Sequence, residues 1–182
     1  MSVPLPPICP MHGGACGLEG SIVQERLASK PYVFVALPSS ESFNDTEAAI
    51  RTVVEGGYVF SQKYTQKKTH GKKISAVLAR EERFVGQGIC KICQLCWFCD
   101  FGIVEIGGLN PNVMIEIGLM MGFGKKLLYG LHLSYTNLKQ VPFDLGNPML
   151  VPYESTIRLS SNLEDKINFV LMISRGRRQR QR

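Results

Sequence analysis

Two glutamates, Glu105 and Glu116, lie close together in the stretch DFGIVEIGGLNPNVMIEIG, which runs from Asp100 to Gly118. Glu105 ends a short apolar run, and Glu116 falls on the second turn of a helix that we expect to begin beside Asn110. A carboxylate can stabilise a cationic transition state, attack an electrophilic carbon or exchange a proton. This pair is therefore our first candidate for chemistry on a bound ligand.

The residues around the two glutamates predict the elements that hold them. Phe101–Ile106 is a continuous apolar run, as expected for a buried parallel strand. Gly107 and Gly108 allow the chain to turn, and Asn110 followed by Pro111 is typical of a helix start, with Asn as cap and Pro at the first helical position. Because ligands of open α/β sheets bind at the carboxyl ends of the strands, we expect both carboxylates to converge there.

This stretch resembles the N-(deoxy)ribosyltransferase-like group, which contains the nucleoside 2-deoxyribosyltransferases and the related TIR-like nucleotide-binding domains. Those proteins have a strand ending in an acid, a glycine-containing turn, an Asn-Pro-Asn or Asp-Ser-Gly helix start, and a Glu-hydrophobic-Gly triplet, a pattern that Asn110–Gly118 matches. The resemblance covers roughly Tyr32 to Met172. Within it, Tyr32–Pro38 is similar to the family's first strand, Gly124–Lys126 to the entry of its fourth strand, and Pro142–Leu145 to its late loop.

The resemblance implies roles for individual residues. Glu116 takes the place of the carboxylate that stabilises or attacks the anomeric carbon while an N-glycosidic bond breaks. Glu105 takes the place of an acid, usually Asp in the relatives, that holds the base or the ribose hydroxyls or donates a proton to the leaving base. Further ligand contacts are expected from Pro38, Ser39, Ser40, Gly108, Asn110, Asn112 and Asp144.

Two functions are compatible with these residues. The first is a nucleoside or nucleotide N-glycosidic-bond transferase or hydrolase of the 2-deoxyribosyltransferase type, which requires no cofactor. The second is a non-catalytic nucleotide-binding sensor of the TIR-like type. The loop Ser39–Phe43 favours the second, because it has one aromatic residue where the transferases use several to grip the base. In either case we expect a nucleoside, nucleotide or NAD-like ligand, and a homo-oligomer, since relatives often complete the site across a subunit interface.

Strand and helix patterns alternate along the chain without hairpin signals, which predicts a parallel sheet covered on both faces. Right-handed crossovers then give an α/β, flavodoxin-like three-layer sandwich whose five-stranded parallel sheet has the order 2-1-3-4-5. The expected strands are Tyr32–Leu37, Tyr58–Ser61, Phe101–Ile106, Lys126–Leu131 and Met149–Tyr153. The expected helices are Phe43–Glu55, Pro111–Phe123, Leu163–Ile173 and the two ends of Ile74–Phe98.

A chain of 182 residues suits one α/β domain, residues 31–173, with an N-terminal arm (1–30) rich in Pro, Gly and Cys and a basic tail (174–182) that we expect to be disordered. The net charge of +6 belongs mainly to that tail, since five arginines fall among the last eight residues. A solvated tail and a weak contact with nucleic acid are the two interpretations. No apolar run approaches the roughly 20 residues that span a bilayer, and no secretory pattern opens the chain. We therefore expect a cytoplasmic protein without membrane contact.

All six cysteines fall in two short segments. They are Cys9 and Cys16, on either side of His12 in the arm, and the C-x-x-C-x-x-C-x-x-C run Cys90, Cys93, Cys96 and Cys99. On a helix the ends of this run would lie about 13 Å apart, too far for one zinc ion with bonds of about 2.3 Å. Zinc could take two of the four with ligands from the arm, and an iron–sulfur cluster would require the helix to unwind. Disulfides between the segments and simple packing of buried thiols are the remaining interpretations.

Overall fold

The computed structural model describes residues 32–56, 74–81, 88–141, 145 and 149–180, with the backbone alone for residue 168 and residues 171–180. Within these residues the chain forms a five-stranded parallel sheet of order β2-β1-β3-β4-β5. The predicted α/β flavodoxin-like fold and its strand order are thereby confirmed. The strands are β1 (Tyr32–Ala36), β2 (Ser75–Leu78), β3 (Phe101–Glu105), β4 (Leu127–His132) and β5 (Leu150–Tyr153).

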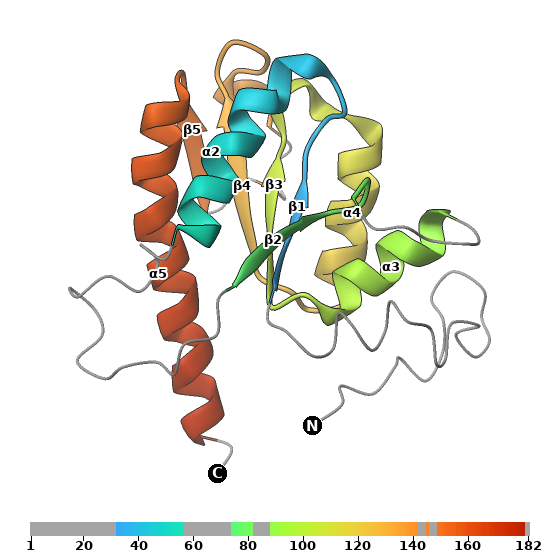
Figure 1. The fold of residues 1–182 in the computed structure, drawn as a ribbon, viewed down its shortest axis with the longest axis vertical. Helices are drawn as coiled ribbons and strands as arrows, with labels where there is room; N and C mark the ends of the chain where they lie inside the picture. Colours follow the sequence, from blue (N-terminus) through green and yellow to red (C-terminus); the bar gives the residue numbers. More distant parts are fainter. Residues whose placement is uncertain (1–31, 57–73, 82–87, 142–144, 146–148, 181–182) are drawn as a thin grey trace.

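Helices cover both faces of the sheet, as Figure 1 shows. One face is covered by α2 (Asn44–Glu55) and α5 (Thr156–Arg180), which pack against each other, and the opposite face by α3 (Gly88–Phe98) and α4 (Pro111–Gly122). In the described part of the chain, short 3₁₀ turns lie in the loops at η1 (Glu41–Phe43), η3 (Gly107–Leu109) and η4 (Leu138–Gln140). The result is the three-layer arrangement expected of an alternating strand and helix pattern.

The central strand β3 contributes to two separate hydrophobic cores. Phe101 and Ile103 pack with the residues of α2 and α5, whereas Val104 and Ile106 pack with those of α3 and α4. Successive side chains of a strand point to opposite faces, so a strand covered on both sides must be apolar throughout. All five residues of β3 are buried accordingly. The edge strand β5 tolerates the exposed Pro152, because an edge strand can spare a backbone donor.

The second strand differs from its predicted position. The structure places β2 at Ser75–Leu78, parallel to β1 with Tyr32 opposite Ser75, where we expected the start of a helix. Ser-Ala-Val-Leu is too short to show a period of its own, and pairing with β1 decides its conformation. The segment Tyr58–Ser61, predicted as this strand, lies outside the described residues.

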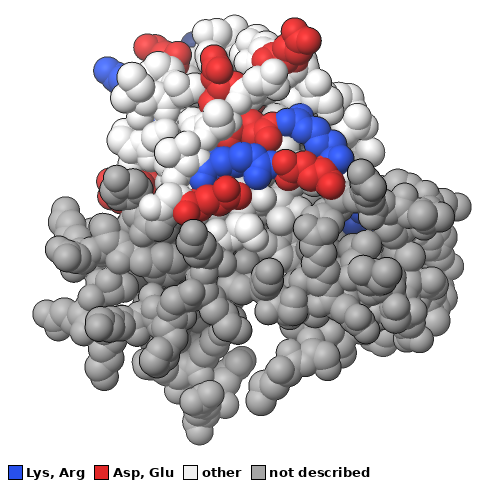
Figure 2. All heavy atoms as spheres, in the orientation of Figure 1, with Lys and Arg blue, Asp and Glu red and all other residues white. Residues whose placement is uncertain are grey.

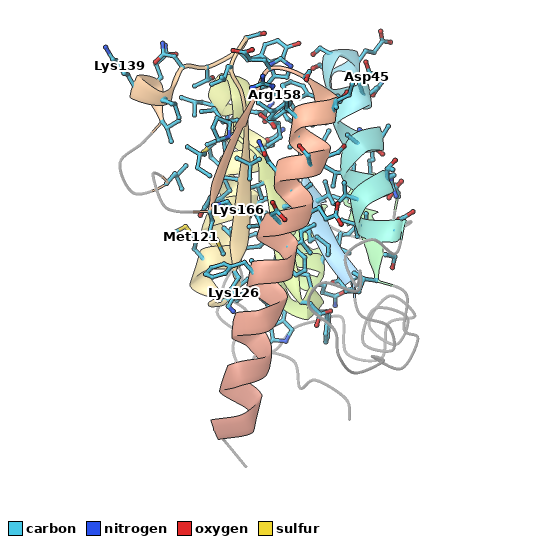
Figure 3. All side chains as sticks on the ribbon, turned by 90° about the vertical axis from the view of Figure 1, so that its left-hand side faces the viewer. Asp45, Met121, Lys126, Lys139, Arg158 and Lys166 are labelled. Carbon is cyan, nitrogen blue, oxygen red and sulfur yellow. The ribbon has the colours of Figure 1, made fainter. Side chains whose placement is uncertain are left out.

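The last helix also differs from the prediction. It begins at Thr156 instead of Leu163 and its backbone continues to Arg180 instead of ending at Ile173. The residues beyond Ile173 are mainly Arg and Gln, which favour helix, and Gly176 alone opposes it. The structure thus gives residues 174–180 a helical backbone, and the expected disorder of the tail stays a prediction. Figure 3 shows α5 running the length of the sheet, with Arg158 near its start and Lys166 further along.

A cluster of charged side chains joins α2 to β2. Arg51 binds Glu47 at 3.0 Å, donates to the Ala76 carbonyl oxygen at 3.2 Å and pairs with Glu81, and Arg80 pairs with Glu47. Figure 2 shows basic and acidic side chains side by side on this face. Because it joins the strand at the sheet's edge to a helix, we interpret it as structural. Within the described residues, no helix is both long and apolar enough to cross a membrane.

Candidate functional site

The loop after β1 carries three of the predicted ligand contacts at the C-terminal edge of the sheet. Pro38 is buried, whereas Ser39 and Ser40 are exposed, and the Ser40 and Ser42 hydroxyl oxygens lie 2.6 Å apart. Strand β1 pairs directly with β3, so this loop and the turn after β3 leave neighbouring strands. The exposed hydroxyls of Ser39 and Ser40 are therefore available to a ligand bound over these two strands.

The turn after β3 has an unusual backbone. Gly108 has φ +74° and Leu109 has φ +48°, so two successive residues occupy the left-handed region. That region costs an L-residue about 1–2 kcal/mol, which explains the glycine at the first position. The Gly108 N–H donates to the Thr136 hydroxyl oxygen at 2.7 Å, and Thr136 is buried. The turn is thus held in place from the loop after β4.

The predicted helix start is present. Asn110 is the N-cap of α4, and its side-chain oxygen accepts hydrogen bonds from the backbone N–H groups of Asn112 (2.9 Å) and Val113 (3.4 Å), with Pro111 at the first helical position. Asn112 is exposed on the first turn. This cap fixes where α4 begins, and so fixes where Glu116 lies. Asp144, also predicted as a ligand contact, lies outside the described residues.

Glu116 is buried in an apolar setting. It is 9% exposed and lies on the side of α4 that also buries Val113, Ile117 and Met120. Within the described residues no hydrogen bond or ion pair reaches its carboxyl, and burial raises its pKa to about 7. The Cys96 thiol of α3 is close enough for the charge of Glu116 to contribute to raising the Cys96 pKa, although burial is the larger cause. Glu116 is therefore a carboxyl that has lost most of its contact with water and gains no hydrogen bond or ion pair, within the described residues, in return.

Glu105 is buried in a contrasting way, because its carboxylate is fully paired. It is 1% exposed; one oxygen accepts the N–H groups of Gly107 (2.7 Å) and His132 (3.1 Å), and the other accepts the Tyr153 hydroxyl at 2.6 Å. Burial raises its pKa, and the three donors act in the opposite direction. Its oxygens are thus occupied by protein groups.

The two glutamates do not converge as predicted. Glu105 bonds to Tyr153, a member of the core under α2 and α5, whereas Glu116 lies beside Val113 and Ile117 in the core under α3 and α4. Since alternate residues of a strand face opposite ways, Glu105 shares its face with Ile103 and points away from α4. The sheet therefore separates the two carboxyls, and Glu116 alone of the pair lies on the α4 side.

The sequence analysis did not predict several residues of this region. His132 and Tyr153 surround Glu105, and an aromatic row connects Phe43 to Tyr135, Tyr135 to His132 and His132 to Tyr153, with neighbouring ring centroids 4.8–4.9 Å apart. Phe43 is buried, whereas Tyr135 is 45% exposed. One signal was available: Gly130 interrupts an otherwise apolar strand, which indicates the close approach of another group.

Three of the four cysteines of the run, Cys90, Cys93 and Cys96, lie on α3, as predicted for a helix, and Cys99 follows directly after its last residue. Cys96 and Cys99 are buried free thiols, and burial raises the pKa of both, that of Cys99 to about 12. Among the described residues, no three or more His, Cys, Asp or Glu side chains are grouped to hold a metal ion. Cys9, Cys16 and His12 lie outside the described residues, so a linkage between arm and helix stays a prediction.

Comparison with known proteins finds structural likeness but no family match. No family model and no curated protein matches the chain. Among solved structures, the CMP N-glycosidase BcmB of Clostridium botulinum is similar, with 17% sequence identity and a TM-score of 0.46, over 73% of this chain and 98% of that chain.

Proposed function

We propose that this protein is an enzyme that breaks or transfers the N-glycosidic bond of a nucleoside, nucleotide or NAD-like molecule, with Glu116 as the catalytic carboxylate. The observation that carries the proposal is the state of Glu116. It is a buried carboxyl with a pKa of about 7, unpaired within the described residues, on the second turn of a helix that begins at the ligand-binding edge of the sheet.

The environment of Glu116 suits a reaction that develops positive charge. Cleavage of an N-glycosidic bond passes through a transition state with oxocarbenium character at the anomeric carbon. A carboxylate in apolar surroundings attracts that charge more strongly than one in water, and no competing donor weakens the attraction. With a pKa of about 7, the carboxyl is half ionised at neutral pH before the ligand arrives. The ionised form either stabilises the cation or attacks it to give a glycosyl-enzyme intermediate.

The exposed polar groups near the start of α4 suit a sugar. The Ser39 and Ser40 hydroxyls follow β1, and the Asn112 side chain is exposed on the first turn of α4. In this proposal they hold the ribose hydroxyls or a phosphate, and so orient the anomeric carbon toward Glu116. Transfer to a second base and hydrolysis by water then differ only in the acceptor that attacks from the same face.

A panel of substrates tests the proposal. Purified protein is incubated with deoxynucleosides, nucleotides and NAD, each with and without a free acceptor base, and released or exchanged base is separated by chromatography. Turnover of at least one class is expected, and exchange with the acceptor would identify a transferase. Absence of base release from every class would refute the enzymatic function.

One observation favours a second candidate. Glu105, which takes the place of the acid that relatives put beside the leaving base, faces away from α4, and its oxygens are occupied by protein groups. A non-catalytic nucleotide sensor would not need that acid. Calorimetric binding of a nucleotide or NAD without any base release would support the sensor over the enzyme.

A further inference from the structure

The carboxylate of Glu105 occupies a space made by two glycines. A Cβ atom built on Gly107 would lie 2.6 Å from one Glu105 oxygen, and a Cβ built on Gly130 would lie 2.6 Å from the other. Both distances are shorter than any Cβ contact found in practice. Neither glycine has a positive φ, so the need for glycine here comes from the carboxylate and not from the backbone. Two different segments, the turn after β3 and strand β4, are thus shaped around one side chain.

A chain of hydroxyls extends this contact to α2. The Tyr153 hydroxyl donates to Glu105, and its oxygen lies 3.1 Å from the Thr46 hydroxyl oxygen. Since the single Tyr153 proton is used on Glu105, Thr46 must donate to Tyr153. Thr46, Tyr153 and Glu105 are all at most 2% exposed. The carboxylate is therefore anchored to β5 and α2 through Tyr153, and to β4 through the His132 N–H.

This anchor holds the turn that starts α4. Gly107, which donates to Glu105, is the first residue of the turn, and Gly108 is held by Thr136. The turn contains the left-handed Leu109 and ends at Asn110, the cap of the helix that carries Glu116. A turn with two left-handed residues persists only where its surroundings fix it.

We propose that Glu105 is a positioning residue, which fixes the turn between β3 and α4 and thereby the place of Glu116, instead of contacting the ligand. This inference rests on the proposed function for its catalytic consequence, and on the contacts of Glu105 alone for its structural part. It also identifies Tyr153, Gly107 and Gly130 as members of the same assembly.

The role depends on the shape and hydrogen bonding of the side chain more than on its charge. In Glu105→Gln, the amide oxygen can accept the Gly107 and His132 N–H groups, while the amide nitrogen donates to Tyr153, which then donates to Thr46. The three groups that bond to Glu105 each keep a partner, and only the second amide hydrogen of the glutamine has no acceptor among them. Glu105→Ala instead leaves the buried Gly107 N–H and the part-buried His132 N–H without this acceptor, and the turn then keeps only the bond from Gly108 to Thr136.

The first experiment compares the two variants. Base release is measured for kcat and KM, and the exchange of the Gly107 and His132 amide hydrogens is followed by NMR. Glu105→Ala is expected to lower kcat about 100-fold through misplacement of Glu116, with faster exchange at Gly107, and Glu105→Gln is expected to restore most of both. If Glu105→Gln lost kcat as completely as Glu116→Gln, the charge of Glu105 would act on the substrate and the proposal would fall.

The second experiment needs no turnover. Gly130→Ala is made in the wild-type chain and in Glu105→Ala, and the denaturation midpoint of each protein is measured. Among the described residues other than its chain neighbours, the Glu105 oxygen alone lies within 3.4 Å of the added methyl group. The midpoint should therefore fall clearly in the first background and little in the second. An equal fall of the midpoint in both backgrounds would mean that Gly130 does not make room for the Glu105 carboxylate, and the proposal would be refuted. If the wild type releases no base but the denaturation midpoints and the amide exchange rates come out as expected, the proposed function would be refuted. The positioning of the turn by Glu105 would still be established.

Discussion

Replacing Glu116 by Gln should make the protein more stable at neutral and alkaline pH. The carboxyl has its ordinary pKa of 4.5 in the unfolded chain and about 7 in the folded protein. As the pH rises between these values, the unfolded chain loses its proton first, so the wild type loses stability until the folded form also ionises. Glutamine cannot ionise, and its variant escapes this loss.

The size of the effect follows from the shift. Each pKa unit corresponds to about 1.4 kcal/mol, which gives at most about 3 kcal/mol, and water at the exposed margin of the carboxyl reduces this to about 2 kcal/mol. The assay is urea denaturation of both proteins at pH 5 and pH 8, with the exposed Glu154→Gln as the matched control. Because the unfolded carboxyl is already largely ionised at pH 5, the advantage of Glu116→Gln over the wild type should grow by about 1.5 kcal/mol from pH 5 to pH 8. An advantage that is absent, or equal at both pH values, would mean that Glu116 is solvated or paired.

The remaining predictions concern the pH dependence of base release, the turn after β3, the tail and the cysteines. Base release should rise with pH up to about 7 and then level off, because the ionised Glu116 is the active form; a fall above pH 7 would assign it the role of an acid. Gly108→Ala should cost about 1–2 kcal/mol in urea denaturation through its left-handed φ, while Gly118→Ala, at an open helical position, should stabilise by about 0.5–1 kcal/mol; similar effects of the two would contradict the turn geometry. Removing residues 174–182 should leave the melting temperature nearly unchanged and weaken salt-sensitive binding to nucleic acid; a large drop in Tm would mean that this end of α5 is docked. Metal analysis and thiol counting on the native protein should detect a bound metal or fewer than six free thiols; six free thiols without metal would leave the cysteines as packing residues.

The parts of the fold that the sequence predicted correctly have strong local signals. The continuous apolar run of β3 and the Asn110-Pro111 cap each depend on a few neighbouring residues, and the structure reproduces both. The position of strand β2 was predicted wrongly, because its four residues show no hydrophobic period of their own and take their conformation from pairing with β1. The end of α5 was predicted wrongly, because the charged segment after Ile173 was expected to be non-helical although Arg and Gln favour helix.

The candidate site was predictable only in part. The sequence places Glu116 at the border of the apolar stripe of α4, and the structure buries it there. The direction of Glu105 did not follow, since a residue that ends a strand can point to either face and its partner Tyr153 is distant in the chain. Gly130 was the local signal for that contact, but a glycine in a strand does not indicate which side chain packs against it.

The catalytic role of Glu116 is tested most directly by one comparison: the kcat of base release by Glu116→Gln and by the wild type, on the best substrate of the panel. The swap keeps the size of the side chain and removes its charge, and circular dichroism confirms that the fold is kept. Our account predicts a fully folded variant whose turnover falls by at least about 100-fold, since the transition state loses its electrostatic partner. A folded variant with wild-type turnover would contradict it.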